Sequence, residues 1–455
     1  MQALNNSIVD PTRLLKIACI IASISMLTSI NLMAGPIYSG SSMTTGPSSN
    51  HFSMASSFYN PAMNALVVNN EEKENNQEET WRISYFPSLA LNAEIGPVDN
   101  FVDDIDELID LLDNPNSASQ NESSNDLLAR FNSTLTKIGE SGYIKQNISI
   151  NAPLFPLYYR LDRLDGVIGM DLTFSSHIGT RILDAPLEFR DNVFKTNTSL
   201  YLKSGLEKKL SVSYGRSLIE EDVGGNLYAG VKVNIINLEL SKQVTLLQEL
   251  AGEDLGDYIR DQYDNNAKTT TNVGIDIGIV WDTRKYRLGL VLENINSPSF
   301  EYNTIGENCV TPNNTSASTN SCQVAAEFIQ TQDELKAKET YTKEPLLRTD
   351  GLYKLTDNWL ASAALDLVAY DDSVGFENQW MHLSTSYETH SFLIPSARIG
   401  YQKNLAGSKT SSLTFGLSLL KYLTLDFEYG LDDVAVDGSK YPRRLGFAMS
   451  ISEPF

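Results

Sequence analysis

The chain has 455 residues and a formal net charge of −22. This acidic balance argues against nucleic-acid binding, because a protein that neutralises phosphates needs a basic surface. No stretch after residue 34 approaches the roughly 18 uninterrupted apolar residues of a membrane-spanning helix. The length fits either two or three globular domains or one large barrel.

The first 34 residues have the pattern of a secretory signal peptide. Arg13 and Lys16 precede an apolar run over 17–30, and small residues follow up to Ala34. The run is shorter than the roughly 20 residues that a transmembrane helix needs. We therefore expect residues 1–34 to be cleaved off and the remaining chain to be exported.

The next segment, 35–79, is rich in small and polar residues and contains a strong turn signal. The letters FYNPA stand at 58–62. Pro61 fixes its own φ and moves Asn60 out of the α region, so the segment cannot form one continuous helix or a central strand. The segment is too short to be a domain, and it is either an inert leader or a plug inside a larger structure.

Two segments have helical rather than strand period. In the first, apolar side chains recur every three or four positions, at Phe101, Ile105, Leu108, Ile109 and Leu112. A second stripe follows a polar linker and comprises Leu127, Leu128, Phe131, Leu135 and Ile138. Together they predict a helical insert near 100–139, which either caps the mouth of a barrel or only adds packing contacts. A third, acidic helix is expected near 243–264.

From about residue 143 onward, apolar and polar residues alternate with a period of two. In the stretch NVGIDIGIVW, one face carries Val273, Ile275, Ile277, Ile279 and Trp281, and the other carries mostly small or polar residues. The same alternation recurs over 411–419, 422–430 and 443–452. Such strands predict an all-β fold, a transmembrane antiparallel β-barrel, because in lipid every backbone group must be paired within a closed sheet.

The candidate strands number fifteen. They lie near 81–95, 143–152, 166–177, 196–203, 207–217, 226–238, 269–281, 286–295, 346–354, 357–369, 379–389, 392–402, 411–419, 422–430 and 443–452. A closed barrel with both termini on one side needs an even number, so we predict about 14 strands over 80–455 and place the error between 153 and 240. Long and short connections alternate, which assigns the long one, 296–344, to the extracellular side.

Cys309 and Cys322 are the two cysteines that follow the expected signal peptide. In an exported chain they are expected to form a disulfide within the loop 296–344, and two free thiols are the alternative. The chain has 4 histidines and no H-E-x-x-H, G-x-S-x-G or Walker pattern, so we expect neither an enzyme nor a cofactor. The acidic loop at 432–437 lacks an EF-hand pattern, and no metal site is expected.

The order of these features resembles a known superfamily. A signal peptide, a small-residue segment with ASSFYNPA at 55–62, and an alternating barrel that ends in Phe455 resemble the long-chain fatty acid transporter (FadL) superfamily of outer-membrane proteins. The conjugal-transfer TraF-like branch is the closer resemblance. It is supported by FYNPA, by the acidic helical pair, and by LGLVLENINSPSF (288–300), GLYKLTDNWLASAALDL (351–367) and ARIGYQKN (397–404).

This resemblance implies a location, a function and partners. Asn60, Pro61 and Ala62 would belong to an N-terminal hatch and face the lumen, where a kinked strand in transporters opens a lateral exit. Phe455 would be read by the barrel assembly machinery of the bacterial outer membrane. The implied function is passive transport of hydrophobic, fatty-acid-like small molecules, with membrane lipid around the barrel. The alternative is a structural component that binds other parts of a conjugal transfer or secretion system.

Overall fold

The computed structural model describes residues 38, 40–47, 54, 56–68, 80–113, 124–190, 193–220, 224–249, 263, 265–307, 309, 317–331, 335–389, 391–420 and 422–451. The expected signal peptide 1–34 and the terminal Phe455 lie outside these residues. Among the helices described, none is long and apolar enough to cross a membrane.

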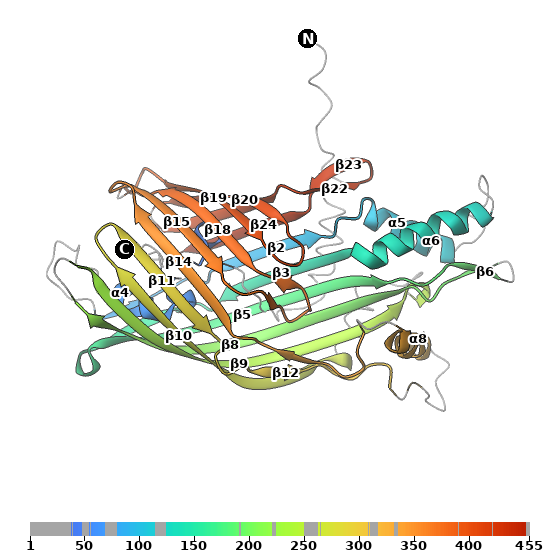
Figure 1. The fold of residues 1–455 in the computed structure, drawn as a ribbon, viewed down its shortest axis with the longest axis horizontal. Coiled ribbons are helices and arrows are strands. Elements are labelled where there is room, and N and C mark those ends of the chain that lie inside the picture. The colour runs from blue at the N-terminus through green and yellow to red at the C-terminus, as the bar shows by residue number, and fades with distance from the viewer. Residues whose placement is uncertain are drawn as a thin grey trace, which may run out of the picture.

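The architecture is a closed antiparallel β-barrel (Figure 1). Its main sheet has 16 strands, and β1 (Trp81–Ile83) and β4 (Leu157–Leu161) continue the lines of β2 and β3. The other 14 close into a ring because β8 pairs with both β9 and β5. In pairing order the ring comprises β5 (Gly166–Leu183), β3 (Tyr143–Asn151), β2 (Leu89–Ile95), β24 (Arg444–Ile451), β21 (Leu423–Gly430), β20 (Ser411–Leu419), β19 (Ser396–Asn404), β18 (Trp380–Tyr387), β15 (Trp359–Asp366), β14 (Leu346–Lys354), β11 (Tyr286–Glu293), β10 (Lys268–Asp282), β9 (Asn226–Leu246) and β8 (Ser199–Ile219).

The outer surface of the ring is apolar and its inner surface is polar. On β10, Val273, Ile277 and Ile279 are 40, 45 and 46 % exposed, whereas Asp276 between them is 3 % exposed. The same alternation holds on β21, where Phe427 is exposed and faces outward. The predicted transmembrane β-barrel of about 14 strands is therefore confirmed.

The strand count from the sequence was wrong in the region where the error was expected. The two strands predicted at 196–203 and 207–217 are one continuous strand, β8. The break predicted between them, at 204–206, does not exist, and Gly205 within it makes room for a loop inside the barrel, since a Cβ there would collide with the side chain of Ser373. The short strand β4 was not predicted, and the first predicted strand is interrupted between β1 and β2.

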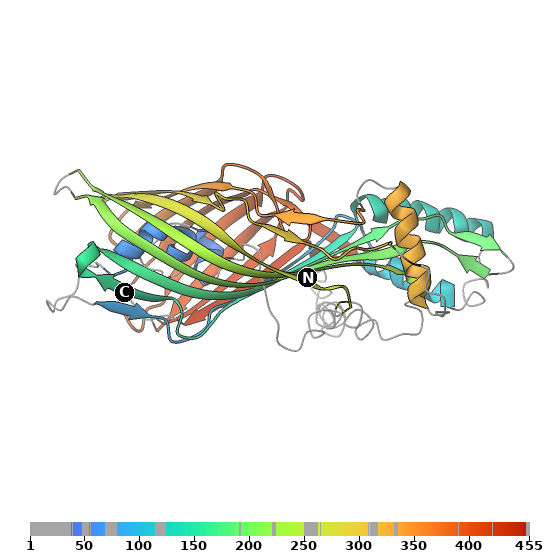
Figure 2. The same cartoon turned by 90° about the horizontal axis from the view of Figure 1, so that it is seen from below.

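Three strands extend far beyond one end of the ring and form a platform. β5, β8 and β9 contain 18, 21 and 21 residues, against 7 in β2. Helices α5 (Phe101–Asp113) and α6 (Ser124–Ser141) cover one side of this extension, with a core that includes Leu108 and Phe131 (Figures 1 and 2). Helix α8 (Ala317–Thr331) contributes Phe328 to a second core on the same strands.

Two expectations for this end of the molecule need correction. The first is the helix expected over 243–264. Its residues 243–246 continue β9, because Val244 and Leu246 pack into the core beside α8 with strand period. Residues 247–249 form a 3-10 turn, η3 (Leu247–Glu249), and 250–262 lie outside the described residues. The connection 296–344 is not a plain loop, since it holds α8 and the pair β12 (Ser299–Glu301) and β13 (Thr340–Thr342).

The remaining short elements outside the N-terminal segment are three hairpins and one turn. The hairpins are β6 (Glu188–Arg190) with β7 (Val193–Lys195), β16 (Tyr370–Asp371) with β17 (Glu377–Asn378), and β22 (Asp433–Val436) with β23 (Ser439–Pro442). A 3-10 turn, η2 (Asp162–Leu164), joins β4 to β5.

The N-terminal segment lies inside the barrel, at the end opposite the platform (Figure 2). Its elements are α2 (Ser42–Thr45), α3 (Ser56–Tyr59), the 3-10 turn η1 (Pro61–Met63) and α4 (Asn64–Val68). We call its described residues, from 38 to 68, the hatch. Most of its side chains are buried against the inner wall, so the hatch fills the lumen at this level.

Candidate functional site

The predicted Asn-Pro-Ala turn forms the point at which the hatch changes direction. Asn60 has extended backbone angles, φ −137° and ψ 111°, and Pro61 begins η1, as the local preferences of proline require. The Asn60 Oδ1 accepts a hydrogen bond from the Ala62 backbone N–H at 3.1 Å. Its Nδ2 donates to the Ile279 carbonyl of β10 at 3.1 Å, so one side chain both caps the turn and attaches it to the wall.

The turn is seated on a row of three glycines in the wall. Gly215 of β8 lies opposite Gly230 of β9, which lies opposite Gly278 of β10. A Cβ on Gly230 would lie 2.5 Å from both the Ala62 nitrogen and the Pro61 oxygen, and one on Gly215 would lie 2.6 Å from the Pro61 oxygen. A Cβ on Gly278 would overlap the carboxamide of the turn. The glycine row is what allows the backbone of the hatch to approach the sheet so closely.

Polar contacts hold the hatch to the wall on several sides. Lys232 of β9 donates to the Phe58 carbonyl at 2.6 Å, and Asn64 donates to the Ser213 hydroxyl at 2.8 Å. On the opposite side of the ring the Thr44 amide donates to Asp426 at 3.0 Å. The hatch is therefore held by releasable hydrogen bonds and close packing; among the described residues no covalent link ties it to the wall.

Next to the hatch lies an inner cavity of about 160 Å³. Phe58 and Tyr59 of the hatch form one part of its lining. The rest is mostly charged and hydroxylated, including Asp171, His177, Glu207, Lys209, Lys232, Asp276, Glu293, Lys343 and Arg348. Most of these charges are paired across strands, as in Lys232 with Asp276 at 3.1 Å and Arg348 with Glu293 at 2.7 Å. The lining is not the apolar pocket that a fatty-acid chain would require.

A loop between β15 and β18, residues 370–378, folds inward above this cavity. Asp372 holds it in place, because its carboxylate accepts the backbone N–H groups of Val374 and Phe376 at 3.1 and 2.9 Å and pairs with Lys145 of β3 at 2.6 Å. Burial alone would raise the pKa of Asp372, but the Lys145 ammonium and these hydrogen bonds outweigh burial and lower it. We call residues 370–378 the constriction loop.

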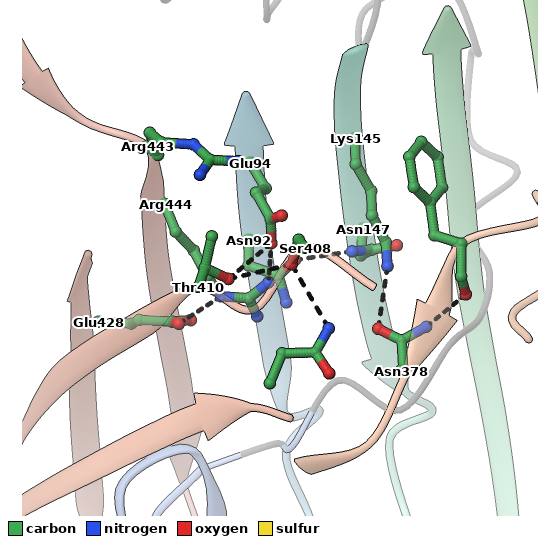
Figure 3. Close-up of polar contacts among 12 residues, drawn as sticks. Asn92, Glu94, Lys145, Asn147, Asn378, Ser408, Thr410, Glu428, Arg443 and Arg444 are labelled. Carbon is green, nitrogen blue, oxygen red and sulfur yellow. Dashed lines mark hydrogen bonds and ion pairs between the residues drawn. The ribbon is translucent and has the colours of Figure 1, made fainter. Parts of the chain in front are cut away.

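A second, outer cavity of about 430 Å³ lies on the platform side of the constriction loop. Its lining includes Glu94, Lys145 and Asn378, and Lys145 donates to Asn378. Glu94 is also paired with Arg444, which lies between Glu94 and Glu428 (Figure 3). Asp371 lines both cavities. The two cavities, the constriction loop and the hatch therefore follow one another along the lumen.

The barrel wall is interrupted beside the hatch. The ladder between β2 and β24 ends at the pair Leu89 and Met449. Beyond it β1 pairs with β4, and its other edge pairs with no strand of the described chain. Arg82 of β1 donates to the Val67 carbonyl of the hatch at 2.9 Å, so the hatch and this open edge are in direct contact.

The remaining site predictions have mixed outcomes. Cys309 and Cys322 form the expected disulfide, which links the connection between β12 and α8 to α8 itself. Asn60, Pro61 and Ala62 lie inside the barrel in the contacts described above. The glycine row, Asp372 and Lys145 were not predicted. Gly278 falls on the small and polar face of the stretch NVGIDIGIVW, but its alignment with Gly215 and Gly230 depends on strand register.

A family model described as "F plasmid transfer operon, TraF, protein" matches residues 57–366. The chain belongs to this family. The expected TraF-like resemblance is thereby confirmed, and the match includes the Asn-Pro-Ala turn, the glycine row and β14. No curated protein matches the TraF-family chain.

Solved structures that resemble the chain include a transporter, a channel mutant and a FadL homologue. The Ralstonia pickettii toluene transporter TbuX has 11 % identity and a TM-score of 0.41, with 94 % of this chain and 100 % of that chain covered. A mutant of the TodX monoaromatic hydrocarbon channel has 12 % identity and a TM-score of 0.45, with 92 and 99 % covered. A Pseudomonas aeruginosa FadL homologue has 13 % identity and a TM-score of 0.36, with 93 and 99 % covered.

Proposed function

We propose that the protein is exported, folds in the bacterial outer membrane and is a passive channel for hydrophobic small molecules. The observation that carries this proposal is the hatch, which occupies the lumen of a closed barrel through non-covalent contacts on the glycine row. A barrel that served only as a membrane anchor would not need a seat shaped for a separable segment.

The proposed route follows the cavities. A molecule enters the outer cavity, passes the constriction loop, reaches the inner cavity at Tyr59 and leaves when the hatch moves. The exit is sideways, between β1 and the end of β24. The interrupted ladder supports this step, as do the exposed Trp81, Tyr85 and Phe86 beside it, because an apolar passenger would meet an apolar rim.

The size of the inner cavity favours a small passenger. A cavity of roughly 150 Å³ accommodates one benzene ring in other proteins, and the inner cavity measures about 160 Å³. A long acyl chain would place many more apolar groups against this charged lining than a single ring would, so its passage is less favourable. We therefore propose single-ring compounds rather than long-chain fatty acids as passengers.

The test compares uptake in cells that lack the protein with uptake in cells that regain it. Labelled toluene and a labelled long-chain fatty acid are supplied separately at low external concentration. The proposal predicts that loss of the protein slows toluene entry and leaves fatty-acid entry unchanged, and that the wild-type gene restores entry. Equal toluene entry with and without the protein contradicts a channel function.

A second candidate function is a structural role in conjugal transfer or secretion. It is favoured by the family description and by the platform, where α5, α6 and α8 form a separate body on three extended strands. Plasmid transfer frequency, measured in the same two strains, separates the candidates. A large drop in transfer with normal toluene entry would favour the assembly role.

A further inference from the structure

Four side chains meet where the hatch touches the wall next to the inner cavity. Tyr38 belongs to the hatch, and Arg348, Tyr370 and His382 come from β14, the constriction loop and β18. We call these four residues the junction cluster. Arg348 and Tyr370 line the inner cavity together with Tyr59.

Aromatic rings form one side of the junction cluster. The Tyr38 ring packs edge-on against His382 at 4.9 Å between centroids and against Tyr59 at 5.4 Å. The His382 ring is in turn 6.2 Å from the Trp380 ring. Tyr38 and Tyr59 thus form one aromatic surface of the hatch, and its Tyr59 end lines the inner cavity, where it can contact a planar ligand.

Five polar atoms of the junction cluster have no partner among the residues that the structure describes. Within the described part of the chain, the Tyr38 and Tyr370 hydroxyls, both ring nitrogens of His382 and the Nη2 of Arg348 have no hydrogen-bond partner. Arg348 is 2 % exposed and His382 is 1 % exposed. Because buried polar groups in native proteins are nearly always paired, this concentration in one place points to a ligand with hydrogen-bonding groups.

The one guanidinium of the junction cluster is already paired with two carboxylates. Arg348 donates from Nε to Asp366 and from Nη1 to Glu293, both at 2.7 Å. An anion would add to two neighbouring carboxylates, and a cation would meet the guanidinium. Burial raises the pKa of Tyr38, so its phenol remains protonated and neutral. The pattern therefore favours a neutral ligand that offers both hydrogen-bond acceptors and donors.

We propose that the junction cluster binds a neutral, single-ring molecule that carries a hydroxyl or carbonyl group, with its ring on the Tyr38 and Tyr59 surface and its polar group at Arg348 and Tyr370. This inference rests on the proposed function, since the ligand is the molecule that the channel transports. It narrows the transported class from single-ring compounds in general to polar aromatic compounds. Half of the site belongs to the hatch, so hatch movement would take the site apart and release the ligand.

The test uses three fluorinated ring compounds that differ in one substituent. Binding of 4-fluorophenol, 4-fluorotoluene and 4-fluorobenzoate to the purified full-length protein is measured by ¹⁹F NMR line broadening. We expect 4-fluorophenol to bind more tightly than the other two. Tyr370→Phe and Tyr38→Phe each keep the ring and remove one hydroxyl, and each should weaken 4-fluorophenol binding about threefold to tenfold.

The control variant is Tyr353→Phe, which removes a hydroxyl from the outward face of β14 and should leave all three affinities unchanged. Because the Tyr38 and Tyr370 hydroxyls contact no partner among the described residues, the two test variants should fold and melt like the wild type. Equal binding of the three compounds, tighter binding of 4-fluorobenzoate, or unchanged 4-fluorophenol binding in both variants would overturn the inference.

The binding result and the uptake result fail independently. If toluene enters normally through the protein but 4-fluorophenol shows no preference, the site is wrong and the channel function stands. If 4-fluorophenol binds as expected but no ring compound enters through the protein, the site stands and the transport function is wrong.

Discussion

Replacing Gly230 with alanine tests how the hatch is held. The new Cβ would lie 2.4 Å from the Pro61 carbonyl carbon and 2.5 Å from the Ala62 nitrogen and the Pro61 oxygen, whereas ordinary contact begins at 3.4 Å, so the hatch backbone must move by about 1 Å. All three colliding atoms belong to the backbone and cannot rotate away. Overpacking of this kind costs about 1–3 kcal/mol.

The same displacement disrupts a neighbouring hydrogen bond. The Asn60 Nδ2 lies 3.1 Å from the Ile279 carbonyl, and a shift of this size takes the pair beyond hydrogen-bonding distance. Its loss adds about 0.5–1.5 kcal/mol. Together the two effects weaken hatch docking by about 1.5–4.5 kcal/mol, which raises the population of undocked hatch between roughly tenfold and two-thousandfold.

Two measurements check this prediction. Amide hydrogen exchange over residues 56–68 should accelerate by a comparable factor in Gly230→Ala, and single-channel conductance in planar bilayers should show more frequent openings. Gly351→Ala is the matched control, because Gly351 is a strand glycine whose nearest neighbour would be the flexible end of Leu288 at 3.3 Å. If Gly230→Ala exchanges and conducts like Gly351→Ala, the glycine row is not the seat of the hatch.

Three further predictions concern the constriction loop and the disulfide. Lys145→Met leaves the buried Asp372 without its ammonium partner and should destabilise the docked constriction loop by about 3–5 kcal/mol, which is measured as increased conductance. The double variant with Asp372→Asn should reverse part of this increase. An unchanged conductance in Lys145→Met would show that the ion pair does not hold the loop. Because the pKa of Asp372 is lowered from 3.8, the contribution of its carboxylate to loop stability is complete above that pH and is lost as the pH falls through the folded-state pKa. Conductance should therefore be constant from pH 8 to 5 and rise only in stronger acid. A rise near pH 6 would contradict this. The double variant Cys309→Ser, Cys322→Ser should make the connection before α8 sensitive to added protease. The heat-dependent gel shift of the barrel should stay unchanged. Loss of that shift would mean that the disulfide stabilises the barrel itself.

The fold could be predicted from the sequence because one physical rule acts on every strand. Residues such as Ile277 and Asp276 alternate along the chain because the two faces of the sheet meet different surroundings, and this signal is local. The count failed at Gly205 because a glycine that admits a neighbouring loop and a glycine that forms a turn look the same in sequence. Only the partner, Ser373, distinguishes them, and it lies 168 positions away, since 373 − 205 = 168.

The candidate site was predictable only in part for the same reason. The Asn60 turn is encoded by adjacent residues, so its local conformation follows from proline geometry. Its seat requires Gly215, Gly230 and Gly278 to align across three strands, and that depends on registers which the sequence does not state. The junction cluster likewise joins residues from Tyr38 to His382, which come together only when the barrel closes around the hatch.

The central claim is that the outward rows of apolar side chains contact lipid because the sheet is closed. Spin labels on single added cysteines along β20 test it directly, at the outward positions Leu413, Phe415 and Leu417 and the inward positions Ser412 and Thr414. In lipid vesicles, collision with oxygen, which concentrates in the acyl chains, should be high at the three outward labels and low at the two inward ones. Equal oxygen accessibility at neighbouring positions, or high accessibility at every position to a water-soluble nickel complex, would contradict the account.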